Sequence, residues 1–544
     1  MIAVPRRLAD PYFLALLALV AAVIAYLGEL VYAPLLLIPL AVGLVRIVLP
    51  ALRGRLGVAV VDLDLLFLLL HMFAVSTGKP PRKRLFQPNC IVGGYGDYGR
   101  YLNRIASLAV DWGYGFVAAT RYVAREVKNR AFSDFLLRFS EVLRTGEDPT
   151  LFLETEFAAL RRNYQSQYYR AMDVLRIVLG LHTTVMSAAA FVLTVMSVLL
   201  MLTGGDINIY FVTFVSSITL VAMFTAVIYV AVPKEWITPR AKPKPAHVYR
   251  KYNVALAVSV PLAAVLGYLA YGRLGGAEWS LMAVGGALLL PGLVARGIES
   301  RVRKLESFYT IFIRSLGMTY AIIPNYAKAF SSLLMSDFGP LMKPLARAYS
   351  RVSNGIDPRI AWRYFIYDTW SDLIARSTNI FADTVDAGGN TRVVGTALSD
   401  LITRINDLRS LRERTARTFE VTTYIMQALV SAIAIAVIEI IRLFSDYIKV
   451  LATGLEVVEL YGLLMLVLPP ETIALMTNLA VAFLAFLTVA NAITIKVAYG
   501  GIPETLWQQI SLLLVVTSGA VVGIRFMIGV IFREILVPPI LIPA

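Results

Sequence analysis

Cysteine and histidine are scarce in this chain of 544 residues, which has one cysteine, Cys90, and three histidines, His71, His182 and His247. A single thiol excludes an internal disulfide and any metal site built on several cysteines. Three scattered histidines cannot form an H-E-x-x-H motif or a Cys/His cluster. We therefore expect neither a metal centre nor a cofactor.

Charged residues are also few, at 16% of the chain. Soluble domains carry about 25%, whereas this chain has 58% hydrophobic residues and a mean hydropathy of +0.70. Several apolar runs are long enough to cross about 30 Å of hydrocarbon. These features predict a polytopic membrane protein. The net charge of +15 fits the positive-inside rule and attraction to anionic membrane lipids better than nucleic-acid binding.

Motifs that carry chemistry are missing as well. The fragment nearest to a phosphate-binding loop, Ser76–Pro80, lacks both the upstream glycine and the hydroxyl residue that follows the lysine. The glycines at 93–96 are expected in a loop. Asp62 and Asp64 are two residues apart and point to different helix faces, so they are expected to mark a helix start and not a catalytic pair. The chain is predicted not to be an enzyme.

The chain does contain an internal repeat. An offset of 242 residues (355 − 113) pairs Gly113 with Gly355 and Gly146 with Gly388. The same offset pairs Arg121-Tyr122 with Arg363-Tyr364, Arg162 with Arg404 and Arg170 with Arg412. Each copy runs from an apolar hairpin through a charged helical block to another apolar hairpin. In membrane proteins such duplication commonly builds a scaffold with two equivalent parts.

The predicted fold is an all-α polytopic membrane protein with about nine transmembrane helices and two duplicated cytoplasmic helical bundles. Spans are expected at 12–30, 31–50, 175–203, 207–233, 254–272, 279–296, 419–444, 472–493 and 509–532. The corresponding domains are a transmembrane hairpin (1–50), cytoplasmic domain 1 (51–173), a group of four spans (174–296), cytoplasmic domain 2 (297–418) and a group of three spans (419–544). Within the group of four spans, the basic linker at 234–251 is expected to be extended and solvated. Residues 457–470 are expected to form a half-helix or an interfacial segment.

Local signals predict helices within both charged blocks. Ser133-Asp134 is expected to cap one helix and Gly146 to end it, after which Asp148-Pro149 begins the next. Asp357-Pro358 is expected to begin a helix in the second block. Apolar stripes at helical spacing follow in both blocks, and they comprise Leu153, Phe157, Leu160, Tyr164 and Tyr168, and then Val394, Leu398, Leu401, Ile405 and Leu408.

The distribution of Lys and Arg predicts that the N-terminus and both charged blocks are cytoplasmic, in a cell-membrane protein. Four ionisable residues lie within the predicted spans. His182 is expected to be a satisfied interior histidine, and Glu439 and Arg442 to pair along one helix face. Arg525 either extends to an interface or faces a groove that receives a client helix.

The duplicated blocks resemble the type II secretion system F-domain family. The resemblance lies in a helix, a turn glycine and a second amphipathic helix that precede a span: DWGYGFVAATRY with EVLRTGEDPTLFLETEFAAL, and SNGIDPRIAWRY with DTVDAGGNTRVVGTALSDL. The size and extra hairpins are similar to those of archaeal members, the platform proteins of archaella and archaeal type IV pili. The resemblance implies a non-enzymatic platform that engages a hexameric secretion ATPase and passes pilin-like or archaellin-like subunits into a filament.

A basic surface would steer an acidic partner, so the ATPase is expected to contact basic side chains of both blocks. The candidates are Arg121, Arg125, Lys128, Arg130, Arg161, Arg162, Arg363, Arg404, Arg409, Arg412 and Arg414. For each of them singly, a solvated helix face or contact with lipid headgroups is the alternative. A secondary transporter with duplicated repeats is the alternative function, and a membrane glycosyltransferase or lipid-modifying enzyme lacks a visible carboxylate cluster. The filament served and the oligomeric state, a homodimer included, stay open.

Overall fold

The computed structural model describes residues 62–203, 207–233, 235–239, 245–274, 276–452 and 468–536. The predicted hairpin at 12–50 and most of the apolar segment 457–470 lie outside them. Within the described residues the chain forms helices and turns with no strand, and the protein is an all-α polytopic membrane protein as predicted.

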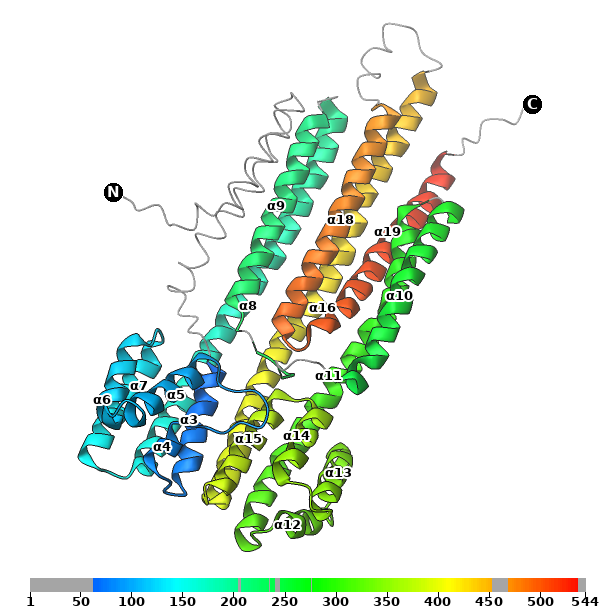
Figure 1. Ribbon diagram of the computed structural model, residues 1–544. Helices are drawn as coiled ribbons and strands as arrows, with labels where there is room; N and C mark the ends of the chain where they lie inside the picture. The colour runs from blue at the N-terminus through cyan, green and yellow to red at the C-terminus, as the bar shows by residue number, and fades with distance from the viewer. Residues whose placement is uncertain are drawn as a thin grey trace, which may run out of the picture.

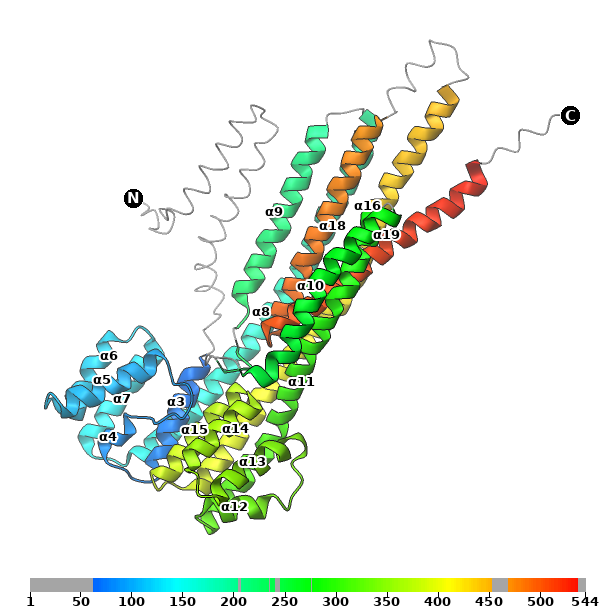
Figure 2. The ribbon, with the colours of Figure 1, turned by 45° about the vertical axis from the view of Figure 1, so that its right-hand side comes forward.

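Seven of the described helices are long and apolar enough to cross a membrane, and they match the seven spans predicted after residue 174. In Figures 1 and 2 they extend to one side of two helical lobes; we call the near end of the spans their lobe-side end. The seven are α8 (Pro149–Thr203), α9 (Ile207–Ala231), α10 (Ala246–Leu274), α11 (Ala277–Ile322), α16 (Thr391–Ala452), α18 (Pro470–Tyr499) and α19 (Leu506–Leu536), which follows the short η3 (Pro503–Thr505).

Lobe 1 consists of the first part of α8 with α3 (Leu63–Ser76), α4 (Arg82–Leu85), α5 (Asp97–Val110), α6 (Gly115–Glu126) and α7 (Arg130–Thr145). Asp62 caps α3 by accepting a hydrogen bond from the Leu65 backbone at 3.1 Å, as expected of a helix start. The predicted cap at Ser133-Asp134 is wrong, because Asn129 caps α7 through its side-chain oxygen. Gly146 ends α7 in the left-handed conformation at φ 78°, which confirms the predicted stop.

Lobe 2 consists of the neighbouring parts of α11 and α16 with α12 (Tyr326–Leu333), η2 (Gly339–Leu341), α13 (Met342–Ser353), α14 (Pro358–Thr369) and α15 (Asp372–Asp386). Helix bounds recur at the sequence offset. Helices α7 and α15 begin at Arg130 and Asp372, and α8 and α16 begin at Pro149 and Thr391. These matching bounds support the predicted duplication.

One apolar core runs through both lobes. Helix α3 contributes most to the contact between them, because every residue from Leu65 to Ser76 is buried. It packs against α8 of its own lobe and α15 of the other. A helix enclosed on all sides needs no polar face, which explains the nearly unbroken apolar sequence of α3. The predicted stripes of α8 and α16 lie in the same core, where only Leu160 is partly exposed.

Lobes and spans are continuous. The predicted domain boundaries at 173, 296 and 418 all fall inside uninterrupted helices, α8, α11 and α16, which contain 55, 46 and 62 residues. At 1.5 Å per residue, α16 is about 90 Å long. No break in the helix separates the lobe from the span in α8 or α16, whereas α11 contains Pro291 shortly before the predicted boundary at 296.

The basic linker corrects a prediction. We expected residues 234–251 to be extended and solvated, but Ile237 is buried and its carbonyl accepts a hydrogen bond from the Asp372 backbone at 2.9 Å. Helix α10 already begins at Ala246. The apolar Ile237 and the buried arginines of α16, described below, hold this part of the linker on lobe 2.

A chain of polar side chains joins four spans. His182 of α8 hydrogen-bonds the Asn491 amide oxygen of α18 through Nε2 at 3.0 Å. The Asn491 amide donates to Gln427 of α16 at 2.8 Å. Gln427 in turn donates to Thr488 at 3.1 Å and to Thr517 of α19 at 2.9 Å. Such hydrogen bonds hold membrane helices together. His182 is an interior histidine, as predicted, but it is satisfied only at Nε2, because its buried Nδ1 has no hydrogen-bond partner among the described residues.

Helices α11 and α16 cross closely at Gly317 and Gly395. A Cβ added to Gly317 would lie 2.5 Å from the Thr391 carbonyl oxygen and 2.9 Å from the Cα of Gly395. Gly317→Ala is therefore expected to force the helices apart and lower the free energy of unfolding by about 1–3 kcal/mol. Thermal unfolding of the purified protein in detergent measures the change. Gly297→Ala, on α11 with open space around it, is the control and should be neutral or slightly stabilising. An equal loss in both variants would contradict the close crossing.

Candidate functional site

Four of the predicted contact residues lie on or beside α6. Arg125, Lys128 and Arg130 are exposed, whereas Arg121 is half-buried. Arg121 forms an ion pair with Glu141 of α7, and its Nε donates to Ser140 at 3.3 Å. The structure therefore leaves three of these cations exposed, whereas Arg121 is held against α7.

Exposed aromatic residues accompany these cations, and the sequence analysis missed their exposure. Trp112, Tyr114 and Tyr122 have 72%, 62% and 54% of their surfaces exposed. Arg121, Tyr122 and Arg125 follow at helical spacing on one side of α6. We call the set Trp112, Tyr114, Arg121, Tyr122 and Arg125 the α6 face. Aromatic residues and arginines dominate binding energy in protein interfaces, and bulky apolar groups exposed together mark candidate contact surfaces.

Lobe 2 carries the counterpart on α14. Ile356, Ile360 and Tyr364 are 41%, 43% and 52% exposed and lie beside the exposed Arg363; we call these four the α14 face. The Arg351 guanidinium stacks over the Tyr364 ring at 4.5 Å. Ile356 and Tyr364 occupy the repeat positions of Tyr114 and Tyr122. The only signal in the sequence was the repeated Arg-Tyr pair, since exposure depends on how the helices pack.

The other exposed candidates lie along α8 and α16. Arg162 and Arg404 are exposed, and Arg161 is half-buried with its guanidinium 5.6 Å from the centre of the Phe157 ring. Arg414 is exposed as well. With Arg176 of α8 it lines a groove of about 470 Å³ between α8 and α16. This group is therefore separate in sequence position and helix from the α6 and α14 faces.

Arg409 and Arg412 are buried, which excludes the contact with a partner that was predicted for them. Arg409 is 7% exposed and forms ion pairs with Glu306 at 3.0 Å and Glu235 at 3.2 Å. Arg412 is 4% exposed and donates to three backbone carbonyls, those of Ala498 and Val497 at 2.8 Å and of Pro233 at 3.0 Å. A buried guanidinium needs such partners. These two residues fasten the linker and the end of α18 to α16.

The contact between the lobes is polar at one edge. His71 of α3, buried, hydrogen-bonds Tyr95 at 2.9 Å and Asp383 of α15 at 2.8 Å. Burial favours a higher pKa for Asp383, but hydrogen bonds from His71 and the Asn89 backbone, with the charge of Arg84, outweigh it and hold that pKa below its usual value. This carboxylate therefore stabilises the contact at neutral pH and stops doing so only as the pH falls through the lowered pKa.

The turn-rich segment 87–99, predicted to be a loop, is one only as far as Gly96, because α5 begins at Asp97 and the glycines at 93–96 lead directly into it. The loop lies on α15. The Asn379 side chain accepts from the Ile91 backbone at 3.0 Å and donates to the Val92 carbonyl at 2.8 Å. Burial raises the pKa of the Cys90 thiol in this segment to about 12. The thiolate is the reactive form, so Cys90 is expected to be inert at neutral pH.

Arg525 is paired with acidic residues of the neighbouring spans, and its contact with a client helix stays a prediction. It forms an ion pair with Glu278 of α11 and another with Glu439 of α16 at 2.8 Å. Glu439 also pairs with Arg442 at 3.2 Å, which confirms that predicted local pair. Four charges from α11, α16 and α19 thus compensate one another within the spans, as buried charges must.

Within the residues that the structure describes, no group of three or more His, Cys, Asp or Glu side chains is arranged to hold a metal ion. The candidate site is therefore a set of contact surfaces: the α6 face, the α14 face and the cations of α8 and α16. The cations of α8 and α16 lie on helices that continue into the spans, whereas α6 packs on α5 and α7, and α14 on α13 and α15.

Comparison with known proteins gives two relatives. Flagella accessory protein J of Methanocaldococcus jannaschii is 24% identical over 425 residues, which are 75% of this chain and 74% of that protein. Flagella accessory protein J of Methanococcus voltae is 26% identical over 305 residues, 53% of this chain and 53% of that protein. No family model and no solved structure matches the chain.

The structural role of Arg412 can be separated from a surface role. Arg412→Lys keeps the charge but cannot reach three carbonyls at once, so it is expected to lower the free energy of unfolding by about 3 kcal/mol. Arg414→Lys, two residues away and exposed, should leave stability unchanged. Thermal unfolding of both purified variants tests the assignment. Equal stability of the two would contradict the role given to Arg412.

Proposed function

We propose that this protein is a non-enzymatic membrane platform for assembly of a type IV pilus-like filament such as an archaellum. Its similarity to two flagella accessory proteins J supports this proposal, as does the resemblance of both charged blocks to the F-domain family. In the proposed arrangement the lobes are cytoplasmic, a hexameric secretion ATPase docks on them, and pilin-like subunits leave the membrane beside the spans.

The observation that carries the proposal is the continuity of α8, α11 and α16 from the lobes into the spans. A chain without a nucleotide-binding motif must receive work from a partner. Helices α8 and α16 have no proline after Pro149, the first residue of α8, so their backbone hydrogen bonds continue along the helix and make it stiff. Helix α11 contains Pro291, which lacks an N–H and can bend the helix. A displacement imposed on a lobe therefore moves the spans with which the filament subunits are in contact.

The α6 and α14 faces are the proposed docking surfaces. Each combines at least one exposed tyrosine with an arginine at a matching repeat position. Positive charge raises the association rate with an acidic partner, and aromatic side chains supply most of the affinity. Two related faces on one chain also suit a partner that presents several copies of the same surface, as a hexamer does.

The polar groups within the spans agree better with a scaffold than with a transporter. The series of hydrogen bonds that runs from the His182 side chain to the Thr517 side chain joins four helices to one another. The charges of Glu278, Glu439, Arg442 and Arg525 are likewise paired internally. Polar groups that hold helices together fit a rigid bundle, whereas a transporter needs polar groups that bind substrate near the midplane.

Docking on the α6 face can be tested with a double variant. Tyr122→Ala with Arg125→Glu removes an exposed ring and reverses a charge without touching the core, so copurification of the secretion ATPase is expected to fall at least about tenfold. The control is Lys343→Glu, an exposed charge reversal on α13, which should leave copurification unchanged. Unfolding temperatures of both should match that of the parent protein. Undiminished copurification by the double variant would refute docking on this face.

The orientation can be tested by thiol labelling with an impermeant maleimide. Cysteine at position 125 (Arg125→Cys) should react only after the cells are permeabilised, whereas Tyr271→Cys, at the far end of α10, should react in intact cells. Cys90 should contribute a background on the order of a hundredfold slower, because its raised pKa leaves little thiolate. A Cys90→Ser version checks that background. Labelling of position 125 in intact cells would reverse the proposed orientation.

A further inference from the structure

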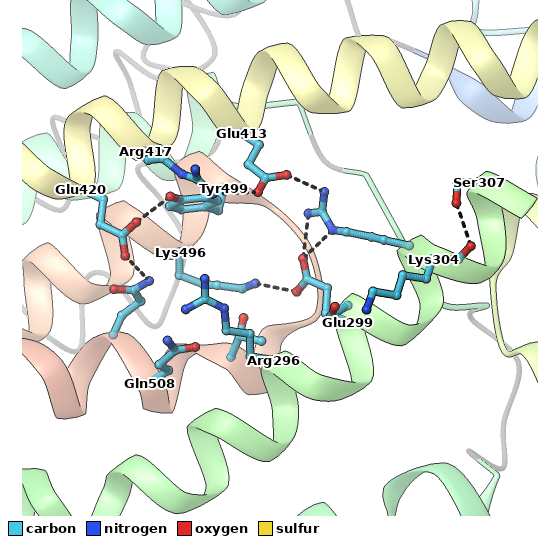
Figure 3. A pocket seen from close by; sticks show the side chains of 14 residues that line it. Arg296, Glu299, Lys304, Ser307, Glu413, Arg417, Glu420, Lys496, Tyr499 and Gln508 are labelled. Atoms are coloured by element: carbon cyan, nitrogen blue, oxygen red, sulfur yellow. Dashed lines mark hydrogen bonds and ion pairs between the residues drawn. The ribbon is translucent and has the colours of Figure 1, made fainter. Parts of the chain in front are cut away.

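A polar cavity of about 410 Å³ lies where α11, α16, α18 and the turn from η3 into α19 meet. Figure 3 shows its lining, in which α11 and α16 approach the turn between α18 and α19 from opposite sides. None of the fourteen side chains that line the cavity is aliphatic. Neither the docking proposal nor the helix packing described above accounts for a polar cavity among membrane helices.

Positive charge exceeds negative charge in this cavity. Its basic residues are Arg296, Arg303, Lys304, Arg417 and Lys496, and its acidic residues are Glu299, Glu413 and Glu420. Five cations face three anions, so the lining carries an excess of two positive charges. A concave basic surface of this kind attracts anions.

The acidic residues form ion pairs with only three of the five cations. Arg303 pairs with Glu299 at 2.8 Å and with Glu413 at 3.1 Å. Lys496 lies 3.8 Å from Glu299, and Arg417 lies 3.7 Å from Glu413. No ion pair or hydrogen bond of the Arg296 or Lys304 side chain is found among the described residues.

The remaining acid, Glu420, is occupied by neutral donors. It accepts hydrogen bonds from the Tyr499 hydroxyl at 2.5 Å and from the Gln509 amide at 2.9 Å. It keeps its negative charge but forms no ion pair with Arg296 or Lys304. The two unpaired cations lie two helical turns apart on α11, on the same side as Glu299 and Arg303, and they are the groups left to bind a ligand.

The frame of the cavity is rigid. Gly500 and Gly501 have φ values of 72° and 80°, and a Cβ on Gly501 would lie 2.4 Å from the Glu299 carboxylate. Glu299 also accepts a hydrogen bond from the Ile502 backbone at 3.2 Å. Because Arg303 pairs with Glu299, and Glu299 is held against this turn, the Arg303 guanidinium is in place before a ligand arrives, which lowers the cost of binding.

The level of the cavity in the membrane identifies the ligand. Arg296 follows the apolar part of α11, and Thr505 precedes the apolar part of α19, so the cavity lies at the lobe-side end of the spans. Trp507 packs beside the turn with Ile502, and tryptophan is enriched at the level of lipid headgroups. Basic pockets between membrane helices at this level suit the phosphate of a lipid.

We propose that this cavity binds the phosphate-bearing headgroup of an anionic phospholipid from the lobe-side leaflet. Arg296 and Lys304 supply the charge-assisted hydrogen bonds to the phosphate, and Arg303 is the positively charged floor, positioned by Glu299 and Glu413. Thr505 and Gln508, which follow the turn between α18 and α19, line the opposite wall of the cavity, so a headgroup bound there lies between α11 and this turn and bridges them. It thereby fastens the α10–α11 pair to the rest of the bundle, independently of any docking on the lobes.

The experiment uses the full chain in nanodiscs of phosphatidylcholine, with or without phosphatidylglycerol. Phosphatidylglycerol is expected to raise the unfolding temperature of the parent protein and to stay bound in native mass spectrometry. Arg296→Gln with Lys304→Gln should abolish the rise and weaken retention of the lipid about tenfold or more. Arg301→Gln, an exposed arginine of α11 outside the cavity, is the matched control and should keep both effects.

Three outcomes overturn the proposal. The first is that phosphatidylglycerol raises the unfolding temperature of the double variant as much as that of the parent protein, which would assign the effect to bulk surface charge. The second is that Arg301→Gln loses the rise in unfolding temperature and the bound lipid as fully as the double variant does. The third is that inorganic phosphate raises the unfolding temperature in phosphatidylcholine discs and phosphatidylglycerol raises it no further, which would assign the cavity to a soluble phosphate. Unchanged unfolding temperatures of the variants in phosphatidylcholine alone establish that the replacements leave the fold intact.

Discussion

The backbone of a membrane span must satisfy its own hydrogen bonds, because hydrocarbon offers none, and this constraint governs the connection between the lobes and the membrane. Helices α8, α11 and α16 leave the hydrocarbon without interruption and continue as the main supports of the lobes. The soluble and membrane parts therefore share structural elements and cannot be treated as domains joined by linkers.

Buried cations complete this connection at the lobe-side end of the spans. Arg412 bonds carbonyls that precede the linker and carbonyls at the end of α18, while Arg409 joins Glu306 of α11 to Glu235 of the linker. The basic cavity lies in the same layer, with Glu299 shared between Arg303 and the glycine turn. Positive residues in this layer thus have three different surroundings: backbone carbonyls, carboxylates and open space. Only the last is available to a ligand.

The two copies of the repeat are similar in outline and different in their contacts. Helix bounds and the exposed tyrosines of α6 and α14 recur at the same offset. The close crossing, however, occurs in lobe 2 alone. Val75 of α3 corresponds to Gly317 of α11, and Leu153 of α8 corresponds to Gly395 of α16. Because these side chains are large, α3 and α8 cannot approach as closely as α11 and α16. Helix α3 is instead wide and apolar on all sides and fills the space between the lobes. Divergence of this kind lets one copy serve as the packing partner of the other while each retains an exposed face.

Sequence alone determined the features that depend on local pattern: seven spans within the described residues, the helix starts at Asp62, Asp148 and Asp357, the stop at Gly146, and the 242-residue repeat. Hydropathy and capping act over a few residues, so they can be read without a fold. Tertiary structure alone decided which arginines are free. Arg409 and Arg412 lie in the same basic run as Arg414, yet only Arg414 reaches solvent. Burial of a charge depends on partners more than eighty residues away, and no local pattern records them.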